Sequence, residues 1–523
     1  MTMRFALATG IGATLLCSAA LAQRQDSPLI NSPWPISHAG HAKQASTALV
    51  GPTGTSVAVQ RRFFKEDAGE FFGTSPFHVI GSQRYRDAPN ARALWGASLT
   101  HVYKYIIDGD RFAYIDSAEL SRFPVSVAWN LFGLSGPDRI VVPSPFGLRV
   151  RSAKGSVCAG KTPALLIYAD GESADSPLAC VGKFEFTAQR LNEACGFRRA
   201  VLGTTGVSTG VMPGGEVVIM LSDDRGFGRS KKRETYAVVI NNALTDIVTC
   251  ERIGETSTSN AYPSERVAPN RTRLYLATEI ELLFVDYVED ERRIEVAARM
   301  PLPLRGRTGT TPTLFDAGGD RFVILVDGRC AVAKVFTGEI RCSKDATRGS
   351  QLVAVRRDPR NPEVIVTDLP AFIDTVENSP AVWREHVVVA NYTGYTPDGK
   401  RDGKPDVARG VVKLSWNPGR GRFDIDWQRS DLQISGVPTI SGGAGLVYSS
   451  GAEDDGQTYF YGLALDDTGA RRGGDTVVRV AVGPAFETER KARDQVFDAG
   501  NNTLINDDGS AIFPGGEVLV RIR

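Results

Sequence analysis

The feature that most limits what this chain can fold into is a repeated β-strand pattern. In each repeat, a short strand led by Thr, Ser or Asn is followed by a turn through Gly or Asp. A strand rich in β-branched residues comes next, as in Val437-Pro438-Thr439-Ile440 before AGLVYSSG. Such strands, recurring along the whole chain, indicate a fold built from repeated antiparallel sheets.

The first residues of seven such repeats define the period of the pattern. The spacings between them are 79, 51, 51, 67, 61 and 63 residues, counted from Asn130, Thr209, Asn260, Thr311, Asn378, Thr439 and Asn502. Repeats of roughly 50 to 80 residues, with about four strands each, fit the blades of a β-propeller. We therefore predict an all-β, seven-bladed β-propeller with disulfides. Eight blades also fit, because the 79-residue interval has room for another.

The two ends of the chain are predicted to meet. The last repeat, NNTLINDDGSAIFPGGEVLVRIR, is one strand short at the chain end, whereas early strands such as those in VYKYIIDGDRFAYIDS have no leading segment. We expect N-terminal strands to complete the last blade, because a closed ring leaves no exposed sheet edge. The only helical turn expected after the first residues is in RKARDQVF, residues 490–497.

The stretch CAVAKVFTGEIRC, residues 330–342, has the pattern of a β-hairpin with a cysteine at each end. Residues 333–338 align with residues 464–469, and both segments end in a Thr-Gly turn. We predict that this hairpin is the outer half of one blade. A disulfide between its ends would pin an outer strand that has a neighbour on one side only.

The first 22 residues have the features of a secretory signal peptide. Arg4 precedes an apolar run from Phe5 to Leu16, and the small-residue site Ala20-Leu21-Ala22 follows. Cys17 suggests a lipid anchor as an alternative. A small residue is expected directly before a lipidated cysteine, and Leu16 fits that position poorly. No later run reaches the roughly 20 apolar residues of a spanning helix. We expect a secreted or periplasmic protein without a membrane span, divided into a signal peptide (1–22), an N-terminal extension (23–95) and a propeller (96–523).

The predicted export decides how the cysteines are expected to be used. Six remain after the signal peptide, and none of them forms a CxxC pair, so an oxidising compartment favours disulfides over metal binding. Six cysteines allow 15 connectivities, which the sequence leaves open. Nearest-neighbour pairing would join Cys158 to Cys180, Cys195 to Cys250, and Cys330 to Cys342.

The charge of the chain excludes some partners. The 61 basic and 60 acidic residues are balanced, and the cluster at Arg229–Arg233 fits a solvated loop. Nucleic acid and anionic membrane surfaces are therefore poor partner candidates. The remaining candidates are a small-molecule or glycan substrate or, for a scaffold, a protein partner.

The Ala-x-x-x-Thr-Gly turns, the Thr/Ser-Pro strand openings and the Trp-containing segment SPWPISHAGHAKQAST, residues 32–47, resemble the quinoprotein alcohol dehydrogenase-like superfamily of pyrroloquinoline-quinone-type propellers. The resemblance implies a propeller fold. The quinone enzymes of that superfamily bind their cofactor with calcium, a stacking tryptophan and often a disulfide between adjacent cysteines. This chain has no adjacent cysteines and no CxxCH site, so pyrroloquinoline quinone is not the expected cofactor. The superfamily also includes non-catalytic assembly scaffolds.

Chemistry in a propeller is expected where loops of several blades meet over the tunnel. Loops entering the innermost strands and loops joining second to third strands share one face. Oxygen-rich side chains in these loops suit Ca²⁺ or another divalent cation, which could polarise a substrate oxygen. The same residue types also start strands and turns by bonding the nearby backbone. The predicted site has Glu377 as a catalytic group, Asn260, Asn378, Asp498 and Asn501 as metal ligands, and Thr310, Arg225, Asn391 and Tyr392 as substrate-binding residues.

The chain has only five histidines. His78 and His101 are candidate acid–base groups or ligands at the tunnel mouth, with a structural role as the alternative. His38-x-x-His41 fits either half of a metal site or a surface loop, and His386 fits a structural position in a strand.

Three functions remain open at this stage. The first is an extracytoplasmic hydrolase or lyase that cleaves an ester, lactone, glycan or aryl ether at the tunnel mouth, with or without a divalent cation. The second is a binding or scaffold propeller without catalysis. The third is a quinone-dependent dehydrogenase.

Overall fold

The computed structural model describes the following parts of the chain. They are residues 32–35, 38–54, 56–63, 74–98, 101–119, 133–136, 138–144, 157–158, 162, 164–196, 209–224, 233–254, 261–278, 280–304, 310–328, 330–334, 339–342, 349–361, 363–373, 376, 378–392, 410–434, 436–453, 455–484, 502–515 and 518–523. The predicted signal peptide, the loop at 229–232 and the helical turn at 490–497 lie outside these residues.

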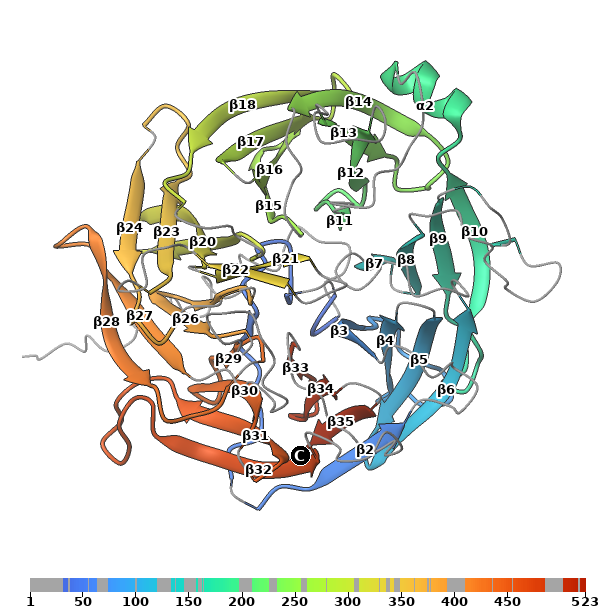
Figure 1. The fold of residues 1–523 in the computed structure, drawn as a ribbon. Coiled ribbons are helices and arrows are strands. Elements are labelled where there is room, and N and C mark those ends of the chain that lie inside the picture. Colours follow the sequence, from blue (N-terminus) through green and yellow to red (C-terminus); the bar gives the residue numbers. More distant parts are fainter. Residues whose placement is uncertain are drawn as a thin grey trace, which may run out of the picture.

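Eight antiparallel sheets of the described residues form the blades of a closed ring (Figure 1). Each blade is named here from its innermost to its outermost strand. The first blade is β3 (Thr74–Ile80), β4 (Arg92–Ser98), β5 (His101–Asp108) and β6 (Arg111–Glu119). The second is β7 (Gly133–Gly136), β8 (Arg139–Ser144), β9 (Ala164–Ala169) and β10 (Ala179–Glu185). The third is β11 (Thr209–Val211), β12 (Val217–Asp224), β13 (Arg233–Ile240) and β14 (Ile247–Gly254).

The remaining blades follow in chain order. The fourth is β15 (Ser264–Ala268), β16 (Arg271–Ala277), β17 (Glu281–Val288) and β18 (Arg293–Pro301). The fifth is β19 (Thr313–Ala317), β20 (Asp320–Asp327), β23 (Gln351–Arg356) and β24 (Val364–Asp368). The sixth is β25 (Ala381–Trp383), β26 (His386–Ala390), β27 (Val411–Asn417) and β28 (Arg422–Arg429). The seventh is β29 (Thr439–Ser441), β30 (Leu446–Ala452), β31 (Gln457–Ala464) and β32 (Thr476–Pro484).

The eighth blade joins the two ends of the chain. It consists of β33 (Leu504–Ile505), β34 (Ala511–Gly515), β35 (Val518–Ile522) and, as its outermost strand, β2 (Val59–Phe63) from the N-terminal region. Strand β2 pairs antiparallel with β35, Val59 opposite Ile522. The prediction that N-terminal strands close the ring is confirmed.

The all-β propeller is confirmed with eight blades, the larger of the two counts that the sequence allowed. The seven repeat markers each precede or begin an innermost strand, from β7 to β33. The eighth sheet lies before the first marker, in β3–β6, whereas the 79-residue interval after Asn130 holds one blade and a helix. Residues 23–95, expected as an extension, contribute β1 (Ser46–Thr47), β2, β3 and the start of β4 to the sheets.

The hairpin at residues 330–342 does not form the outer half of a blade. Strands β21 (Cys330–Lys334) and β22 (Glu339–Cys342) make a separate two-stranded sheet between β20 and β23. Figure 1 shows them inside the ring, toward its centre. In contrast, the turn at 464–469 follows β31 and leads to the outermost strand of the seventh blade. The two Thr-Gly segments are therefore not equivalent, and the predicted superposition is wrong.

One helix of the described residues was missed by the sequence analysis. Helix α2 (Ala188–Cys195) lies at the outer rim of the ring (Figure 1). The Thr187 hydroxyl caps its N-terminus by accepting from the Arg190 N–H, and Gly196 ends it in a left-handed conformation. Both are standard helix signals. The helix is two turns long, so its apolar periodicity was too short to stand out.

Two of the three nearest-neighbour disulfides are confirmed. Cys158 is bonded to Cys180, and Cys195 at the end of α2 is bonded to Cys250 in β14. Cys330 and Cys342 face each other in the register of β21 and β22, and their disulfide stays a prediction. The two bonds indicate an oxidising, extracytoplasmic compartment.

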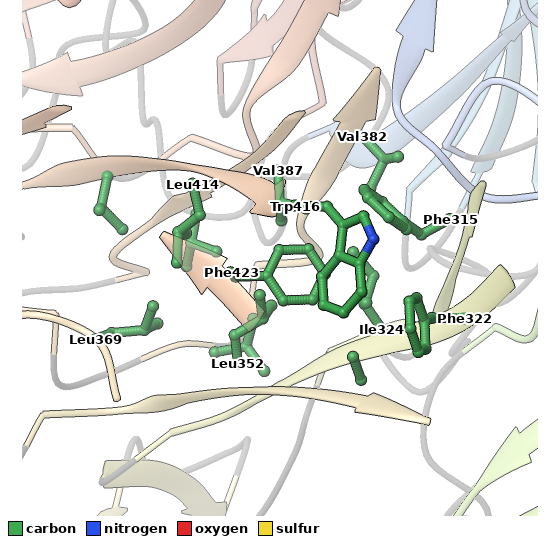
Figure 2. Packing of buried hydrophobic residues seen from close by; sticks show 14 of the residues in the cluster. Phe315, Phe322, Ile324, Leu352, Leu369, Val382, Val387, Leu414, Trp416 and Phe423 are labelled. Atoms are coloured by element: carbon green, nitrogen blue, oxygen red, sulfur yellow. The ribbon is translucent and has the colours of Figure 1, made fainter. Parts of the chain in front are cut away.

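Neighbouring blades pack through apolar faces. Figure 2 shows one such cluster between the fifth and sixth blades, where Phe322, Trp416 and Phe423 meet. The rings of Phe322 and Trp416 lie 4.9 Å apart edge to face, and the indole N–H of Trp416 donates to Asp320 at 2.9 Å. Burial of large aromatic side chains gives each blade interface much of its stability.

Candidate functional site

The structure describes six of the predicted site residues: His78, His101, Thr310, Asn378, Asn391 and Tyr392. The others lie outside the described residues: Glu377, Arg225, Asn260, Asp498 and Asn501. Of the predicted metal ligands, the structure therefore describes only Asn378. Of the predicted catalytic residues, it describes only His78 and His101.

Two predicted residues of the sixth blade lie together. Asn378 precedes β25 and Asn391 follows β26, and the Asn378 side-chain N–H donates to the Asn391 carbonyl at 2.9 Å. The loop entering the blade and the loop after its second strand thus share one face of the ring. The Asn391 side-chain N–H donates to the Phe372 carbonyl at 2.6 Å. Both amides are buried and bond the backbone, which is a structural use of these side chains.

Thr310 is likewise bonded to the backbone. Its hydroxyl donates to the Val326 carbonyl at 3.3 Å and accepts from the Val326 N–H at 3.2 Å. The next residue connects two blades, because the Thr311 N–H donates to the Ser379 hydroxyl at 2.9 Å. Thr310 and Asn378 therefore belong to one region, formed by the fifth and sixth blades.

The two predicted histidines lie on the first blade, across the ring from the fifth (Figure 1). His78 in β3 is fully buried, and its Nε2 lies 2.7 Å from the Tyr103 hydroxyl. Burial lowers the pKa of His78 to about 3, so its imidazole is neutral at physiological pH. His101 begins β5 and is partly exposed. The structure does not bring these histidines to Thr310 or Asn378.

The centre of the ring is lined by the chain's own N-terminal region. Residues 34–35 and 38–47, here called the central strap, run inside the blades as the dark blue segment in Figure 1. Their carbonyls accept N–H groups from one innermost strand after another. The acceptor–donor pairs are Trp34–Ile80, Pro35–Leu134, His41–Ser264, Ala42–Leu314, Gln44–Val382 and Ala45–Ile440.

These bonds involve the first, second, fourth, fifth, sixth and seventh blades in chain order. The His41 side chain bonds the backbone of Val211 in the third blade. Further along, β1 pairs in parallel with β29. The strap therefore satisfies inner-edge N–H groups that would otherwise be unpaired within the ring.

Three basic side chains of the central strap lie close enough to interact. His38 and Lys43 are buried, and His41 is partly exposed. The expectation of a surface loop at His38-x-x-His41 is wrong, because the strap is enclosed by the blades. Lys43 was not singled out from the sequence. The signal available was its place in HAGHAK, beside two of the five histidines.

Burial sets the charge state of this cluster. It lowers the pKa of Lys43 to about 7. Burial and, second, the charge of Lys43 lower the pKa of His38 to about 3. The same two causes lower that of His41 to about 4, against the opposing hydrogen bond to Val211. At neutral pH both imidazoles are uncharged, and a large share of the Lys43 amine is the free base.

The backbone of the strap is strained around these side chains. His38, Ala39, Lys43 and Ala45 have φ values of 61°, 74°, 57° and 47°. They are four of the seven non-glycine residues with positive φ in the described parts of the chain. Each such residue costs of order 1 kcal/mol or more, and strain of this kind concentrates at functional sites.

No group of three or more His, Cys, Asp or Glu side chains that could hold a metal occurs within the described ranges. Asn378, the one described candidate ligand, uses its amide nitrogen on the Asn391 carbonyl. No helix among the residues placed by the structure is long and apolar enough to cross a membrane.

Comparisons with known proteins give no family for this chain. No family model matches the chain, and no curated protein matches it significantly. Among solved structures, the Dos1 propeller aligns with TM-score 0.43 and 8% identity over 88% of this chain and 93% of its own. Sqt1 of Saccharomyces cerevisiae aligns with TM-score 0.41 and 8% identity, over 91% and 99%.

A Bacteroides uniformis protein described as a candidate 6-phosphogluconolactonase aligns with TM-score 0.41 and 10% identity, over 81% of this chain and 96% of its own. The eight four-stranded blades of the structure support the resemblance to quinoprotein propellers at the level of the β-propeller fold, and no family model supports that particular superfamily.

Proposed function

We propose that this protein is an extracytoplasmic β-propeller enzyme that cleaves a small organic or glycan-like substrate by hydrolysis or elimination, with the Lys43 amine as its proton-transfer group. One observation carries the proposal: a strained segment at the centre of the ring holds three basic side chains together, largely uncharged at neutral pH. Perturbed titrating groups concentrated in one place are typical of catalytic centres.

A neutral amine with a pKa near 7 is well matched to general acid–base catalysis. In hydrolysis of an ester or lactone, Lys43 would take a proton from water while the water oxygen bonds to the carbonyl carbon. The bond from that carbon to the leaving oxygen then breaks, and the lysine ammonium returns the proton to the leaving oxygen. In an elimination Lys43 would take the proton from a carbon next to a carbonyl. The electrons of that C–H bond would form a C=C bond to the adjacent carbon while the bond from the adjacent carbon to the leaving oxygen breaks, and the lysine ammonium would return the proton to that oxygen.

Burial alone lowers the pKa of Lys43 into the range that this role needs. Burial and, second, the charge of Lys43 lower the pKa of both His38 and His41, so the two rings stay neutral beside the amine at neutral pH. Glu377, which directly precedes Asn378, is the candidate second acid–base group. Thr310, Arg225, Asn391 and Tyr392 remain the candidate substrate-binding residues on the face where the entering loops lie, and His78 and His101 are candidates from the first blade.

The experiment compares the wild type with Lys43→Met and Lys43→Arg on a panel of ester, lactone, glycan and aryl ether substrates. We expect both variants to lose about 100-fold or more in kcat/KM, the usual contribution of one acid–base group. Wild-type kcat/KM should rise with pH through about 7, as Lys43 loses its proton. Lys183→Met, a matched change on the second blade, should have no effect. Unchanged turnover by a folded Lys43→Met protein would contradict the proposal.

A cation-assisted form of the same function places Ca²⁺ or another divalent cation on Asn260, Asn378, Asp498 and Asn501. Metal analysis, with activity measured before and after chelation, tests this form separately. Loss of activity on chelation, restored by Ca²⁺, supports it. Full activity of the metal-free protein would contradict the cation-assisted form. The Lys43 amine would then remain the proposed catalytic group, acting without a cation.

The second candidate is a binding or scaffold propeller. It is favoured by the strap itself, whose backbone bonds to successive blades fill the middle of the ring, and by the structural bonds of Thr310, Asn378 and Asn391. Absence of turnover on the whole panel, together with capture of a defined protein partner, would favour this candidate over the enzyme.

A further inference from the structure

A loop of the seventh blade lies on the outermost strand of the sixth. The loop is residues 465–475, between β31 and β32, and is here called the docked loop. From β28, the indole N–H of Trp427 donates to the Leu465 carbonyl at 3.0 Å, and the Arg429 guanidinium donates to the Gly474 carbonyl at 2.6 Å. Side chains of the sixth blade thus hold both ends of the docked loop.

Asp466 in the docked loop makes the charged part of this contact. One of its carboxylate oxygens accepts from the Lys413 Nζ in β27, and the other lies 3.2 Å from the His386 Nε2 in β26. The side chains of Lys413 and His386 are 3% and 12% exposed, whereas that of Asp466 is 48% exposed. One carboxylate of the seventh blade therefore serves two basic groups of the sixth.

Two more side chains of the sixth blade complete a ring of polar contacts. His386 Nδ1 lies 2.9 Å from the Ser415 hydroxyl oxygen, and that hydroxyl donates to Asp426. Asp426 in turn lies 2.9 Å from the Lys413 Nζ. Of the five residues in this ring, only Asp466 comes from the seventh blade, so the docked loop leaves the ring open when it moves away.

The charges around His386 decide how the ring responds to acid. Facing the imidazole are the ammonium of Lys413 and the carboxylates of Asp466, Glu385 and Asp426. Burial and, second, the charge of Lys413 lower the pKa of His386 below its ordinary value of 6.5, against the three carboxylates. Movement of the docked loop away from the ring would expose the imidazole to water, which removes the largest of these effects. The proton is therefore held more tightly when the loop is undocked.

We propose that the docked loop is a pH-sensitive contact between the sixth and seventh blades, which opens as the medium becomes acidic. Protonation of His386 places a second cation beside Lys413 in a poorly solvated position, and opening lets water solvate both. The groups involved belong to the rim of two blades and are separate from the central strap. The proposal therefore stands whether or not the protein is an enzyme.

The test follows opening through the Trp427 indole N–H, which is bonded to the docked loop. Hydrogen exchange of this group is measured by NMR of the folded protein between pH 8 and pH 5, with correction for the intrinsic exchange rate at each pH. We expect the opening constant to be level above pH 6.5. Below that pH it should rise by up to about tenfold per pH unit, because opening takes up one proton.

A second tryptophan of the sixth blade is the internal control. The Trp416 indole N–H donates to Asp320 at 2.9 Å on the side that faces the fifth blade. The pKa of Asp320 is lowered, first by its hydrogen bond with Arg356, so this contact keeps its charge down to pH 5. Protection of the Trp416 indole should stay constant. A parallel loss of protection at Trp416 and Trp427 would mean general loosening of the blade and would overturn the proposal.

Two variants test the groups themselves. His386→Gln keeps a polar side chain that takes up no proton, so its opening constant should be level from pH 8 to pH 5. Asp466→Asn should raise opening about tenfold at pH 8, because the bonds to a charged group are weakened. Circular dichroism and thermal melting check folding, and His386→Asn replaces a variant that fails to fold. A level opening constant in the wild type, or an equal pH dependence in His386→Gln, contradicts the proposal, as does unchanged opening in Asp466→Asn.

Discussion

At the scale of single residues, Lys43 is the most informative side chain of the described structure. A lysine is seldom buried, because removal of its ammonium from water is costly, and the protein responds by lowering the pKa of the amine to about 7 from its ordinary value of 10.5. A buried lysine of this kind weakens the fold at neutral pH, a cost that suits the proposed chemical role better than a packing role.

This burial makes the stability of the protein depend on pH. Above pH 7 and below pH 10, unfolded chains hold a proton on Lys43 that folded molecules lack, so the folded state gains about 1.4 kcal/mol per pH unit. Below pH 7 both states are protonated and the contribution is constant. Lys43→Met should therefore exceed the wild type in free energy of unfolding at pH 7, and that advantage should shrink by about 3 kcal/mol by pH 9.5.

Chemical denaturation of both proteins at several pH values measures this difference. Lys183→Met serves as the control, and its difference from the wild type should stay flat over the same range. A flat difference for Lys43→Met as well would mean that Lys43 keeps an ordinary pKa in the folded protein.

At the scale of elements, helix α2 and the β21–β22 hairpin show where a local sequence pattern does not suffice to place an element in the fold. The Thr-Gly turn at 337–338 specifies a reversal of the chain, and a reversal can join two strands within a blade or form an insertion between them. The choice depends on which strand edge is free, and β23 has already occupied the edge of β20. The sequence similarity to the turn at 464–469 could not reveal this.

The disulfide at the end of α2 is expected to fasten the helix to the third blade. Cys195 and Cys250 close a loop with a sequence separation of 55. Replacing both by serine should lower the free energy of unfolding by about 2–4 kcal/mol. Thr187→Ala, which removes only the helix cap, should cost about 1 kcal/mol. Denaturant unfolding measures both changes. If the serine replacements and Thr187→Ala lowered the free energy of unfolding equally, the disulfide would stabilise the helix alone.

Peptide mapping under non-reducing conditions gives the connectivity directly. The digest should contain Cys158 linked to Cys180, Cys195 linked to Cys250, and Cys330 linked to Cys342. A free thiol at Cys330 would remove the third predicted bond and leave the other two in place.

At the scale of the whole molecule, the N-terminal region performs two tasks. Strand β2 closes the eighth blade from outside, and the central strap bonds the innermost strands from inside. An eight-bladed ring has a wider centre than a ring with fewer blades, because the diameter grows with the number of sheets around it. The strap fills that space and supplies acceptors to inner-edge N–H groups, which would otherwise need water.

The strap should therefore protect the innermost strands from hydrogen exchange. The amides of Leu314, Val382 and Ile440, which donate to the strap at 2.8–3.0 Å, should exchange only on global unfolding. Replacing residues 38–47 by a Gly-Ser linker of equal length should speed their exchange and lower the melting temperature, while β2 stays in place. Exchange mass spectrometry measures this, and unchanged protection in the linker variant would contradict a stabilising role for the strap.

Much of the site could not be predicted, for reasons that particular residues make clear. Asn378 and Asn391 were placed on one face correctly, since both lie in loops whose position follows from the blade order. Their bonds to the backbone were not foreseeable, because an amide next to a strand serves a ligand or a carbonyl equally well. His38, His41 and Lys43 lie before the first full blade in sequence, and only their path through the ring gives them a shared environment.

The sequence by itself determined the all-β class, the positions of seven innermost strands and the closure of the ring by N-terminal strands. These follow from strand alternation, turn residues and loop length, which act over short distances along the chain. The tertiary structure alone decided that residues 74–119 form an eighth blade, that 330–342 is an insertion, and that the strap lies in the middle of the ring. Those outcomes depend on which edges remain free and how much space the assembled blades enclose, quantities that exist only once the blades have come together.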